Sequence, residues 1–518
     1  MDGSGSGKSA SYSIPNAHQC LGSYVFTDPK GELYDTTAGY LKEQGYDIKV
    51  LNLVRPQYSD GYNPLMHIAS ELDVDVIANT IVKGQKTDSG SDPYWDDMAE
   101  MLLKALIYYL IATRPEEEQN LASCAELVRA ANKNGGSNLL SDLMSQLPYD
   151  HPARMYYKSI EIAPEKTYGS ILSSLQSKLG KFDSKEIAEL TSTDTINFEE
   201  IGSKKTAVYV ISSDTHTAYD FLLTIFFSQM IQQLYDYADQ NGGRLKERTY
   251  FILDEFANIG KIPDFDKKIS TSRSRGISFS VILQNIDQLE AVYEKSYETI
   301  MGNCDTHVFL GSNSFKTVEY FSKQLGEKTI DRDNISINKD KQNHRTGKSL
   351  SDRIMARALM TPDELRRLDN DLCIIFEKGL KPVKAKKFYY FKHPMDKEMQ
   401  RYAISHNDIG EIDRGTWRKY NPYNPYVEED EEEKIENLNI ESLDDLFEDE
   451  DKKESVPVIK NDTSVNKEDT ETLDSLLNPN VDADAPLLPQ DEDEDTYDLQ
   501  KELEAKFDEL FGPLDDDE

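Results

Sequence analysis

The chain has 518 residues, 38% of them hydrophobic, a length that allows about three domains of ~150 residues each. It contains no run of ~18 apolar residues, and its four cysteines lack metal-site spacing, which argues against a membrane-spanning helix and a cysteine-based metal site. The net charge of −37 is concentrated in residues 427–518, which hold 36 acidic and 7 basic residues, so it does not exclude DNA binding by the rest of the chain.

The first 80 residues alternate between helical and strand patterns. Helices are predicted over residues 8–20 and 33–43, and apolar strands over residues 23–26 and 48–53. Strands separated by helices are typical of parallel β-α-β units. We therefore expect the chain to begin as an α/β fold.

From Trp95 to Leu190 nearly every segment has helical spacing, which predicts an all-α insertion. The α/β pattern then returns, with a helix predicted over residues 219–236. The strands expected in this second part are residues 206–211, 249–253, 278–283, 307–310 and 372–376. The polar stretch 329–351 is predicted to be a flexible loop, and the acidic residues from Val427 onwards are predicted to be disordered.

A glycine-rich segment at the start of the chain contains most of a P-loop: Gly3, Ser4, Gly5, Ser6, Gly7, Lys8 and Ser9. Glycines allow close approach of the backbone to a triphosphate, a lysine suits the β- and γ-phosphates, and a hydroxyl suits Mg²⁺. A flexible Gly/Ser linker would explain the glycines but not the Lys-Ser pair that leads into a helix. Asp2 stands where the pattern has its first glycine, and no strand precedes the loop, so we expect residues upstream of Met1 to be missing.

A second motif is an apolar strand that ends in Asp254 and Glu255, as in a Walker B sequence. Asp254 is expected to hold Mg²⁺ directly or through water, and Glu255 to polarise the attacking water as a general base. A chance match to such a short pattern is common. Its position after a P-loop and an inserted helical segment favours the functional interpretation.

Four further residues are candidates. Asp28, with Glu32 nearby, follows the first strand and is expected near the phosphates, although a capped turn is the alternative. Gln284 follows a later strand and is expected to sense the γ-phosphate or orient water, with a strand-end turn as the alternative. Arg273 and Arg275 are candidates for the arginine that a ring ATPase supplies to its neighbour, with a solvated basic turn as the alternative.

From about Gly3 to Phe391 the chain resembles the TraG/TraD-type coupling proteins of conjugative type IV secretion. The resemblance is carried by the P-loop and by five further stretches: residues 27–33 (TDPKGEL), 62–65 (YNPL), 253–260 (LDEFANIG), 274–277 (SRGI), and 361–364 (TPDE) with 381–385 (KPVKA). It implies ATP and Mg²⁺ as cofactors, assembly as a homohexameric ring, and an N-terminal membrane anchor that this sequence lacks.

Together, the patterns and the resemblance predict an α/β fold with a RecA-like P-loop nucleotide-binding domain in two parts. These parts are residues 1–90 and 196–426, with an all-α inserted domain at residues 91–195 and an acidic disordered tail at residues 427–518.

The function implied is that of an ATPase that recruits relaxase-bound DNA and drives it through a type IV secretion channel. The implied DNA is single-stranded, with a double-stranded substrate left open. The other expected partners are the relaxase and accessory proteins, through the all-α domain and the acidic tail, and the channel ATPases and inner-membrane components. The expected location is the cytoplasmic face of the bacterial cell membrane.

Two alternatives stay open. A substrate-docking adaptor with little ATP turnover is favoured by the incomplete P-loop, whereas Asp254, Glu255 and the two arginines favour a motor. A ring translocase for chromosome segregation or packaging is disfavoured by the DPKGEL string and the helical insertion.

Overall fold

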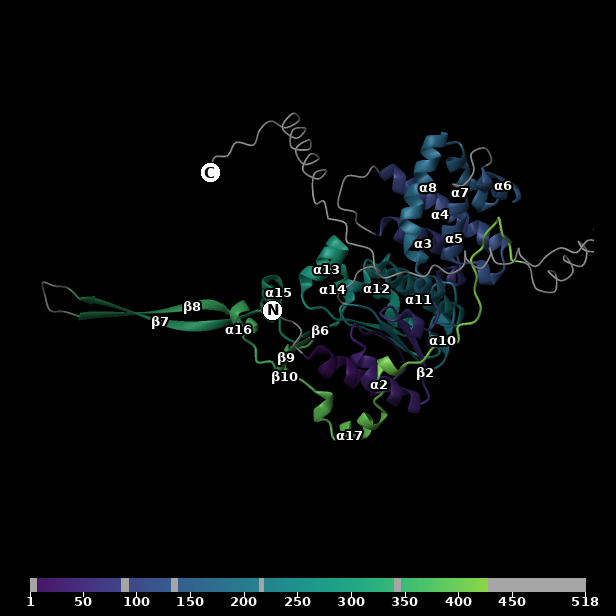
Figure 1. Ribbon diagram of the computed structural model, residues 1–518. Helices are drawn as coiled ribbons and strands as arrows, with labels where there is room; N and C mark the ends of the chain where they lie inside the picture. Colours follow the sequence, from purple (N-terminus) through teal and green to yellow (C-terminus); the bar gives the residue numbers. More distant parts are fainter. Residues whose placement is uncertain (1–6, 85–92, 132–137, 214–218, 340–345, 427–518) are drawn as a thin grey trace, which may run out of the picture. The chain divides into compact units, whose positions relative to one another are not determined.

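The computed structural model describes residues 7–84, 93–131, 138–213, 219–339 and 346–426 (Figure 1). The acidic segment that was predicted to be disordered, residues 427–518, lies outside the described residues, as do Gly3, Ser4, Gly5 and Ser6 of the glycine-rich loop.

The fold is organised around a parallel sheet of five strands in the order β2-β3-β1-β4-β5. Their bounds are β1 (Ser23–Thr27), β2 (Asp47–Asn52), β3 (Thr206–Ile211), β4 (Thr249–Leu253) and β5 (Ile277–Val281). In the register Thr27 stands beside Val210 on one side and Leu253 on the other, so the carboxyl ends of the three central strands meet at one edge of the sheet. Residues that follow these strands are therefore brought together.

Both faces of the sheet are covered. On β1, Tyr24 and Phe26 pack on one face and Val25 packs on the other. The first face is covered by α1 (Ile14–Ala17) and α2 (Glu32–Glu43), and the second by α10 (Phe198–Ser203), α11 (Asp220–Gln240) and α12 (Phe265–Arg275). This burial explains why the strands are nearly continuous apolar runs, as in other parallel sheets.

The segment between β2 and β3 is helical over residues 93–190 where the structure describes it, as predicted, and its first helix precedes the predicted range. It contains α3 (Glu71–Lys83), α4 (Pro93–Thr113), α5 (Leu121–Ala131), α6 (Leu139–Ser145), α7 (Pro152–Glu161), α8 (Glu165–Leu179) and α9 (Lys185–Leu190). The long helix α4 is buried along most of its length and packs against α3, α7 and α8. No helix among those the structure describes combines the length and the apolarity needed to cross a membrane.

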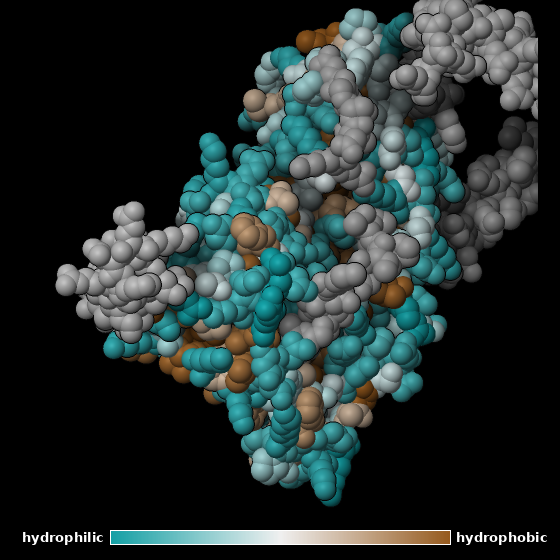
Figure 2. All heavy atoms as spheres, turned by 90° about the vertical axis from the view of Figure 1, so that its left-hand side faces the viewer, coloured by the Kyte–Doolittle hydropathy of each residue, from teal (hydrophilic) through white to brown (hydrophobic). Residues whose placement is uncertain are grey.

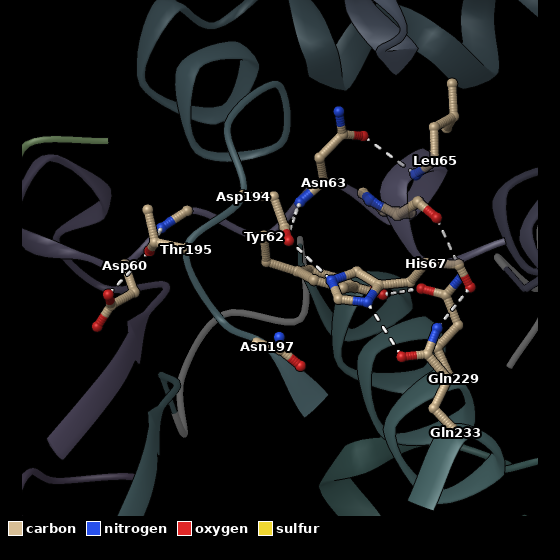
Figure 3. A network of polar contacts seen from close by, with 12 residues as sticks. Asp60, Tyr62, Asn63, Leu65, His67, Asp194, Thr195, Asn197, Gln229 and Gln233 are labelled. Carbon is tan, nitrogen blue, oxygen red and sulfur yellow. Dashed lines mark hydrogen bonds and ion pairs between the residues drawn. The ribbon is translucent and has the colours of Figure 1, made fainter. Parts of the chain in front are cut away.

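A buried polar network holds together the two stretches of chain that enter and leave the helical segment (Figure 3). Tyr62 donates a hydrogen bond to Oε1 of Gln229 at 2.5 Å, and His67 Nε2 lies 2.9 Å from Oδ1 of Asp194. Gln229 and Gln233, both on α11, donate in turn to the backbone carbonyl of His67. The entering and leaving chains are thus bonded to each other, and the entering chain is also bonded to α11.

A second, antiparallel sheet has the order β10-β9-β6, formed by β6 (Thr306–Phe309), β9 (Leu372–Glu377) and β10 (Val383–Lys386). Its small core contains Phe309, Val318 and Phe321. The neighbouring helices are α13 (Ile286–Tyr293), α14 (Tyr297–Gly302), α15 (Phe315–Leu325) and α16 (Pro362–Arg366), and α17 (Asp396–Met399) follows β10.

Residues 329–351 were predicted to form a flexible loop, and this prediction is wrong. Most of them belong to an antiparallel ribbon of β7 (Glu327–Lys339) and β8 (Thr346–Ala358), while residues 340–345 are outside the described part (Figure 1). The polar composition had indicated loop structure. A two-stranded ladder pairs the inward-facing backbone groups of both strands whatever the side chains are, so a polar composition does not exclude strands.

Hydrophilic residues cover most of the face drawn in Figure 2, and hydrophobic residues interrupt it in separate groups. Several large apolar side chains around β9 and β10 are exposed, namely Leu380, Val383, Phe388 and Phe391. Exposed apolar groups of this kind are candidates for contacts with another protein surface.

Candidate nucleotide-binding site

The described end of the glycine-rich loop leads directly into helical turns. Gly7 has a φ of +70°, a left-handed conformation that favours glycine, and the chain then enters a π-helical turn (Ser9–Ser13) continuous with α1. The first hydrogen bonds of this turn run from the backbone N–H and hydroxyl of Ser11 to the carbonyl of Gly7. Lys8 and Ser9 are thereby fixed at the beginning of a helical segment, as a P-loop requires.

Lys8 and Ser9 both face Asp254, which follows β4. The Lys8 ammonium lies 3.6 Å from Oδ1 of Asp254, and the Ser9 hydroxyl donates to Oδ2 at 3.2 Å. Thr27, at the end of β1, donates to the backbone carbonyl of Asp254 at 2.7 Å and anchors this position to the centre of the sheet. Residues that are 245 positions apart in the sequence therefore meet at the carboxyl edge of the strands.

These groups are nearly buried: the side chains of Lys8 and Asp254 are 12% and 10% exposed. Burial raises the pKa of Asp254, while the ammonium of Lys8 and the hydroxyl of Ser9 oppose that rise. Among the described residues, the Lys8 ammonium has no hydrogen-bond partner. A buried cation without a hydrogen bond is costly unless an anion comes to it, so this position fits a phosphate group.

Glu255 is held in a left-handed backbone conformation, with φ 52° and ψ 46°. Its carboxylate accepts hydrogen bonds from Nε2 of Gln284 at 2.9 Å and from Nδ2 of Asn258 at 3.1 Å. A non-glycine residue in this conformation is strained, and such strain is common at functional sites. The structure thus brings Glu255 and Gln284 together, and their action on a water stays a prediction.

Asn258 was not among the residues singled out from the sequence. It could have been found from its position three residues after Glu255, because residues three apart in a turn lie side by side. In the structure the backbone N–H of Asn258 donates to the Glu255 carbonyl at 2.8 Å, and this turn brings the Asn258 side chain to the Glu255 carboxylate.

Asp28 directly follows β1, and its carboxylate is hydrogen-bonded to the nearby turn of the chain. Its carboxylate accepts a hydrogen bond from the backbone N–H of Tyr34 at 2.8 Å, and burial raises its pKa to about 6. This geometry favours the capped-turn interpretation, while Glu32 is exposed in the first turn of α2. A role of Asp28 at the phosphates stays a prediction.

The two candidate arginines are in different environments. Arg275 makes two hydrogen bonds to Asp239, at 3.0 and 2.9 Å, and its guanidinium lies over the ring of Tyr235. The side chain of Arg273 is 92% exposed and, within the part of the chain that the structure describes, pairs only with Asp305, at 3.8 Å. Arg275 is therefore paired within its own chain, whereas the side chain of Arg273 extends into solvent.

The site residues fit a nucleotide with Mg²⁺. The Ser9 hydroxyl and the Asp254 carboxylate are oxygen ligands of the kind that Mg²⁺ takes together with phosphate oxygens and water.

A cavity of about 700 Å³ adjoins the site. Lys8 and Tyr12 are among its lining residues, and β5 and β6 line it along their lengths. Within the described chain, each of these two strands is hydrogen-bonded to a neighbour on one side only. The unpaired sides of β5 and β6 are therefore open edges.

Comparison with known proteins identifies relatives over most of the chain. The family model "Type IV secretory system Conjugative DNA transfer" matches residues 1–410. A conjugal transfer protein TraG of Escherichia coli is 25% identical over 427 residues, which cover 75% of this chain and 66% of that protein. Protein VirD4 of Rhizobium radiobacter is 25% identical over 406 residues, covering 74% of this chain and 55% of VirD4. The chain thus spans less than two thirds of the length of these relatives.

Solved structures of the bacterial conjugative coupling protein TrwB share the fold. A sulphate complex of TrwB has a TM-score of 0.54 at 17% identity, over 74% of this chain and 83% of TrwB. A TrwB complex with the ATP analogue ADPNP has a TM-score of 0.53 at 17% identity and the same coverage. The predicted α/β nucleotide-binding fold is confirmed at this level. The match over residues 1–410 confirms the resemblance read from the sequence: the chain belongs to the conjugative DNA transfer family of type IV secretion systems.

Proposed function

We propose that this chain is the P-loop ATPase of a type IV secretion coupling protein, which recruits relaxase-bound DNA and drives its transfer through the secretion channel. The observation that carries the proposal is the meeting of Lys8 and Ser9 with Asp254, next to a Glu255 carboxylate that Gln284 holds in place. TrwB, which shares the fold, is known in complex with an ATP analogue.

Each residue has a distinct role in this proposal. Gly3 to Gly7 and Lys8 bind the phosphates, and Ser9 and Asp254 hold Mg²⁺, whose charge would offset the charge of the phosphates. Glu255 accepts a proton from the water that attacks the γ-phosphorus as the bond to the β–γ bridging oxygen breaks. Gln284 and Asn258 orient the Glu255 carboxylate through the hydrogen bonds described above.

The arrangement of domains is part of the proposal. Residues 1–90 and 196–426 form the two parts of the nucleotide-binding domain, residues 91–195 form an inserted all-α domain that contacts the relaxase–DNA substrate, and the acidic residues 427–518 bind accessory proteins. The substrate is single-stranded DNA, and the further partners are the channel ATPases and inner-membrane components at the cytoplasmic face of the membrane.

Six copies are proposed to form a ring. The exposure of Arg273, which leaves it able to reach a neighbouring site, and the exposed apolar side chains around β9 and β10 support this assembly. In such a ring Arg273 of one subunit stabilises the transition-state charge in the next.

The test is ATP hydrolysis with and without single-stranded DNA, together with direct measurement of nucleotide binding. Lys8→Ala should abolish binding and turnover, while Lys42→Ala, which removes an exposed lysine of α2 outside the motifs, should change neither. Glu255→Gln should keep nucleotide binding and lower turnover by at least about 10²-fold. Binding without turnover by the unaltered chain would favour the docking adaptor, and turnover unchanged by Lys8→Ala would refute the proposed site.

A further inference from the structure

The last described residues of the chain form a strap that runs from the nucleotide-binding part to the helical segment. The strap, residues 403–426, follows α17 and contains no regular structure beyond the 3₁₀ turn His406–Asp408. In Figure 1 it is the yellow-green trace that runs from beside α2 to beside α5. Because it has no backbone ladder of its own, its course depends on its bonds to the rest of the fold.

The strap begins on α2, next to the nucleotide site. The backbone N–H of Ile404 donates to the carbonyl of Asp35 at 3.0 Å, and the backbone N–H and Nδ1 of His406 lie 2.5 and 2.9 Å from Oδ1 of Asp35. Asp35 is in the first turn of α2, and its neighbour Tyr34 donates to the carboxylate of Asp28, which directly follows β1. The end of β1 is in turn bonded to the chain at the nucleotide site.

Two glycines allow the chain at this end of the strap to lie directly on α2. A Cβ atom at Gly39 would lie 1.9 Å from the carbonyl oxygen of Tyr402, and one at Gly31 would lie 2.4 Å from the ring of His406. Both separations are far below van der Waals contact. Gly39 is inside α2, where glycine is less favourable than alanine by about 1 kcal/mol. The close approach of the chain therefore explains a glycine that the helix itself disfavours.

The middle of the strap bridges the two parts of the molecule. Arg414, whose side chain is almost fully buried, donates to the carbonyl of Pro56 at 3.0 Å and pairs with Glu189 of α9 at 3.3 Å. Arg55, which precedes Pro56, donates to the side chain of Asn407 at 3.1 Å. The strap is thus bonded both to the chain that leaves β2 and to the end of the helical segment.

The strap ends on the helical segment. The backbone N–H of Arg418 donates to the carbonyl of Glu117 at 3.0 Å, and its Nε donates to Oε1 of Glu118 at 3.0 Å. The Glu118 side chain is 2% exposed, and a buried carboxylate depends strongly on its ion pairs. Tyr420 is buried, and its backbone N–H donates to the hydroxyl of Ser123, on α5, at 2.9 Å. This end is therefore held at least as firmly as the end on α2.

We infer that the strap couples the nucleotide site to the helical segment, so that nucleotide bound beside α2 changes the conformational freedom of residues 117–130. This inference rests on the function proposed above. Coupling between distant sites is carried by continuous chains of bonded and packed groups, and the strap is such a chain, held at both ends and in the middle. The segment proposed to contact the substrate would thereby respond to nucleotide occupancy.

The experiment is hydrogen exchange of the full chain, followed by mass spectrometry with and without ADPNP and Mg²⁺. ADPNP should slow exchange of residues 117–130 by at least about 5-fold, the lower end of typical coupling between sites. Helix α7 is the internal reference, because among the described residues it shares no hydrogen bond or ion pair with the strap. General stabilisation by a bound ligand would slow both regions equally, so α7 should change less.

Two variants break the strap at opposite ends, each with a matched control. Gly39→Ala places a methyl group against the chain that enters the strap while favouring the helix, and Gly169→Ala adds the same group inside α8, where nothing lies within 4 Å. Arg418→Ala removes the pair with Glu118, and Lys419→Ala makes the same change of charge at the next residue. Gly39→Ala and Arg418→Ala should each abolish the ADPNP effect, and the controls should keep it.

The double variant tests whether the strap acts as one link. If its two ends belong to the same path, Gly39→Ala combined with Arg418→Ala should lose no more of the ADPNP effect than either change alone. An effect retained in either single variant would overturn the inference, as would its loss in a control or an equal effect in α7. ADPNP affinity is measured for every variant: normal affinity without an effect at residues 117–130 of the unaltered chain refutes the strap coupling alone, and an unaltered chain that binds no ADPNP refutes the proposed function with it.

Discussion

The hydrogen bond between Tyr62 and Gln229 offers a direct test of the polar network that joins the helical segment to the rest of the fold. Tyr62 is fully buried and Gln229 is 1% exposed. The amide of Gln229 cannot turn over, because its Nε2 already donates to the carbonyls of Pro64, at 3.0 Å, and His67, at 3.3 Å. Tyr62→Phe therefore leaves Oε1 of Gln229 buried without its donor.

Leaving a buried acceptor unpaired costs about 1–3 kcal/mol, and we expect Tyr62→Phe to lower the free energy of unfolding by that amount. Urea unfolding followed by circular dichroism measures the change. Tyr149→Phe, which alters a tyrosine that is 74% exposed, is the control and should stay within about 0.5 kcal/mol. In a double-mutant cycle with Gln229→Met, the two losses should be less than additive by at least about 0.5 kcal/mol. Strict additivity would refute the assigned bond.

Two further predictions concern charged groups. Arg273→Ala should lower ATP turnover by about 10³-fold, whereas Arg275→Ala should lower stability through the lost pair with Asp239 and keep most of the turnover; the reverse result would contradict the assignment. Burial raises the pKa of Asp28 from 3.8 to about 6, so the folded state binds more protons than the unfolded state and stability falls as the pH rises from about 4 to 6. Asp28→Asn keeps an oxygen acceptor for Tyr34 and should stabilise the chain at pH 7 by up to about 3 kcal/mol, with the gain disappearing near pH 4 in urea unfolding; an equal gain at both pH values would refute the burial argument.

The parts of the fold that could be predicted from the sequence are those encoded by short-range patterns. The bounds predicted for β3 and β4 are those found, because strands buried on both faces are unbroken apolar runs between polar segments. Asp254 and Glu255 could be predicted in the same way, since they directly follow such a run.

What could not be predicted depends on residues far apart in the chain. His67 and Asp194 are 127 positions apart and have no local pattern that indicates their contact. The different environments of Arg273 and Arg275 depend on Asp239, which belongs to another helix. The β7–β8 ribbon was missed because its sequence is polar and lacks the regular alternation of apolar and polar residues on which strand prediction depends.

Helix α11 contacts both the turn that follows Glu255 and the chain that enters the helical segment. Its Thr224 donates to the carbonyl of Ile259, in the turn that follows Glu255, at 2.6 Å, and its Gln229 and Gln233 bond to the chain entering the helical segment. On this helix Gln229 and Gln233 follow Thr224 by five and nine residues, which is about 8 to 14 Å along the axis. A displacement of the turn after Glu255 during hydrolysis would reach α11 through the Thr224 hydrogen bond and leave it through the hydrogen bonds of Gln229 and Gln233. The phosphates and the part of the molecule proposed to hold the substrate are therefore linked by part of one helix and a hydrogen bond at each side of it.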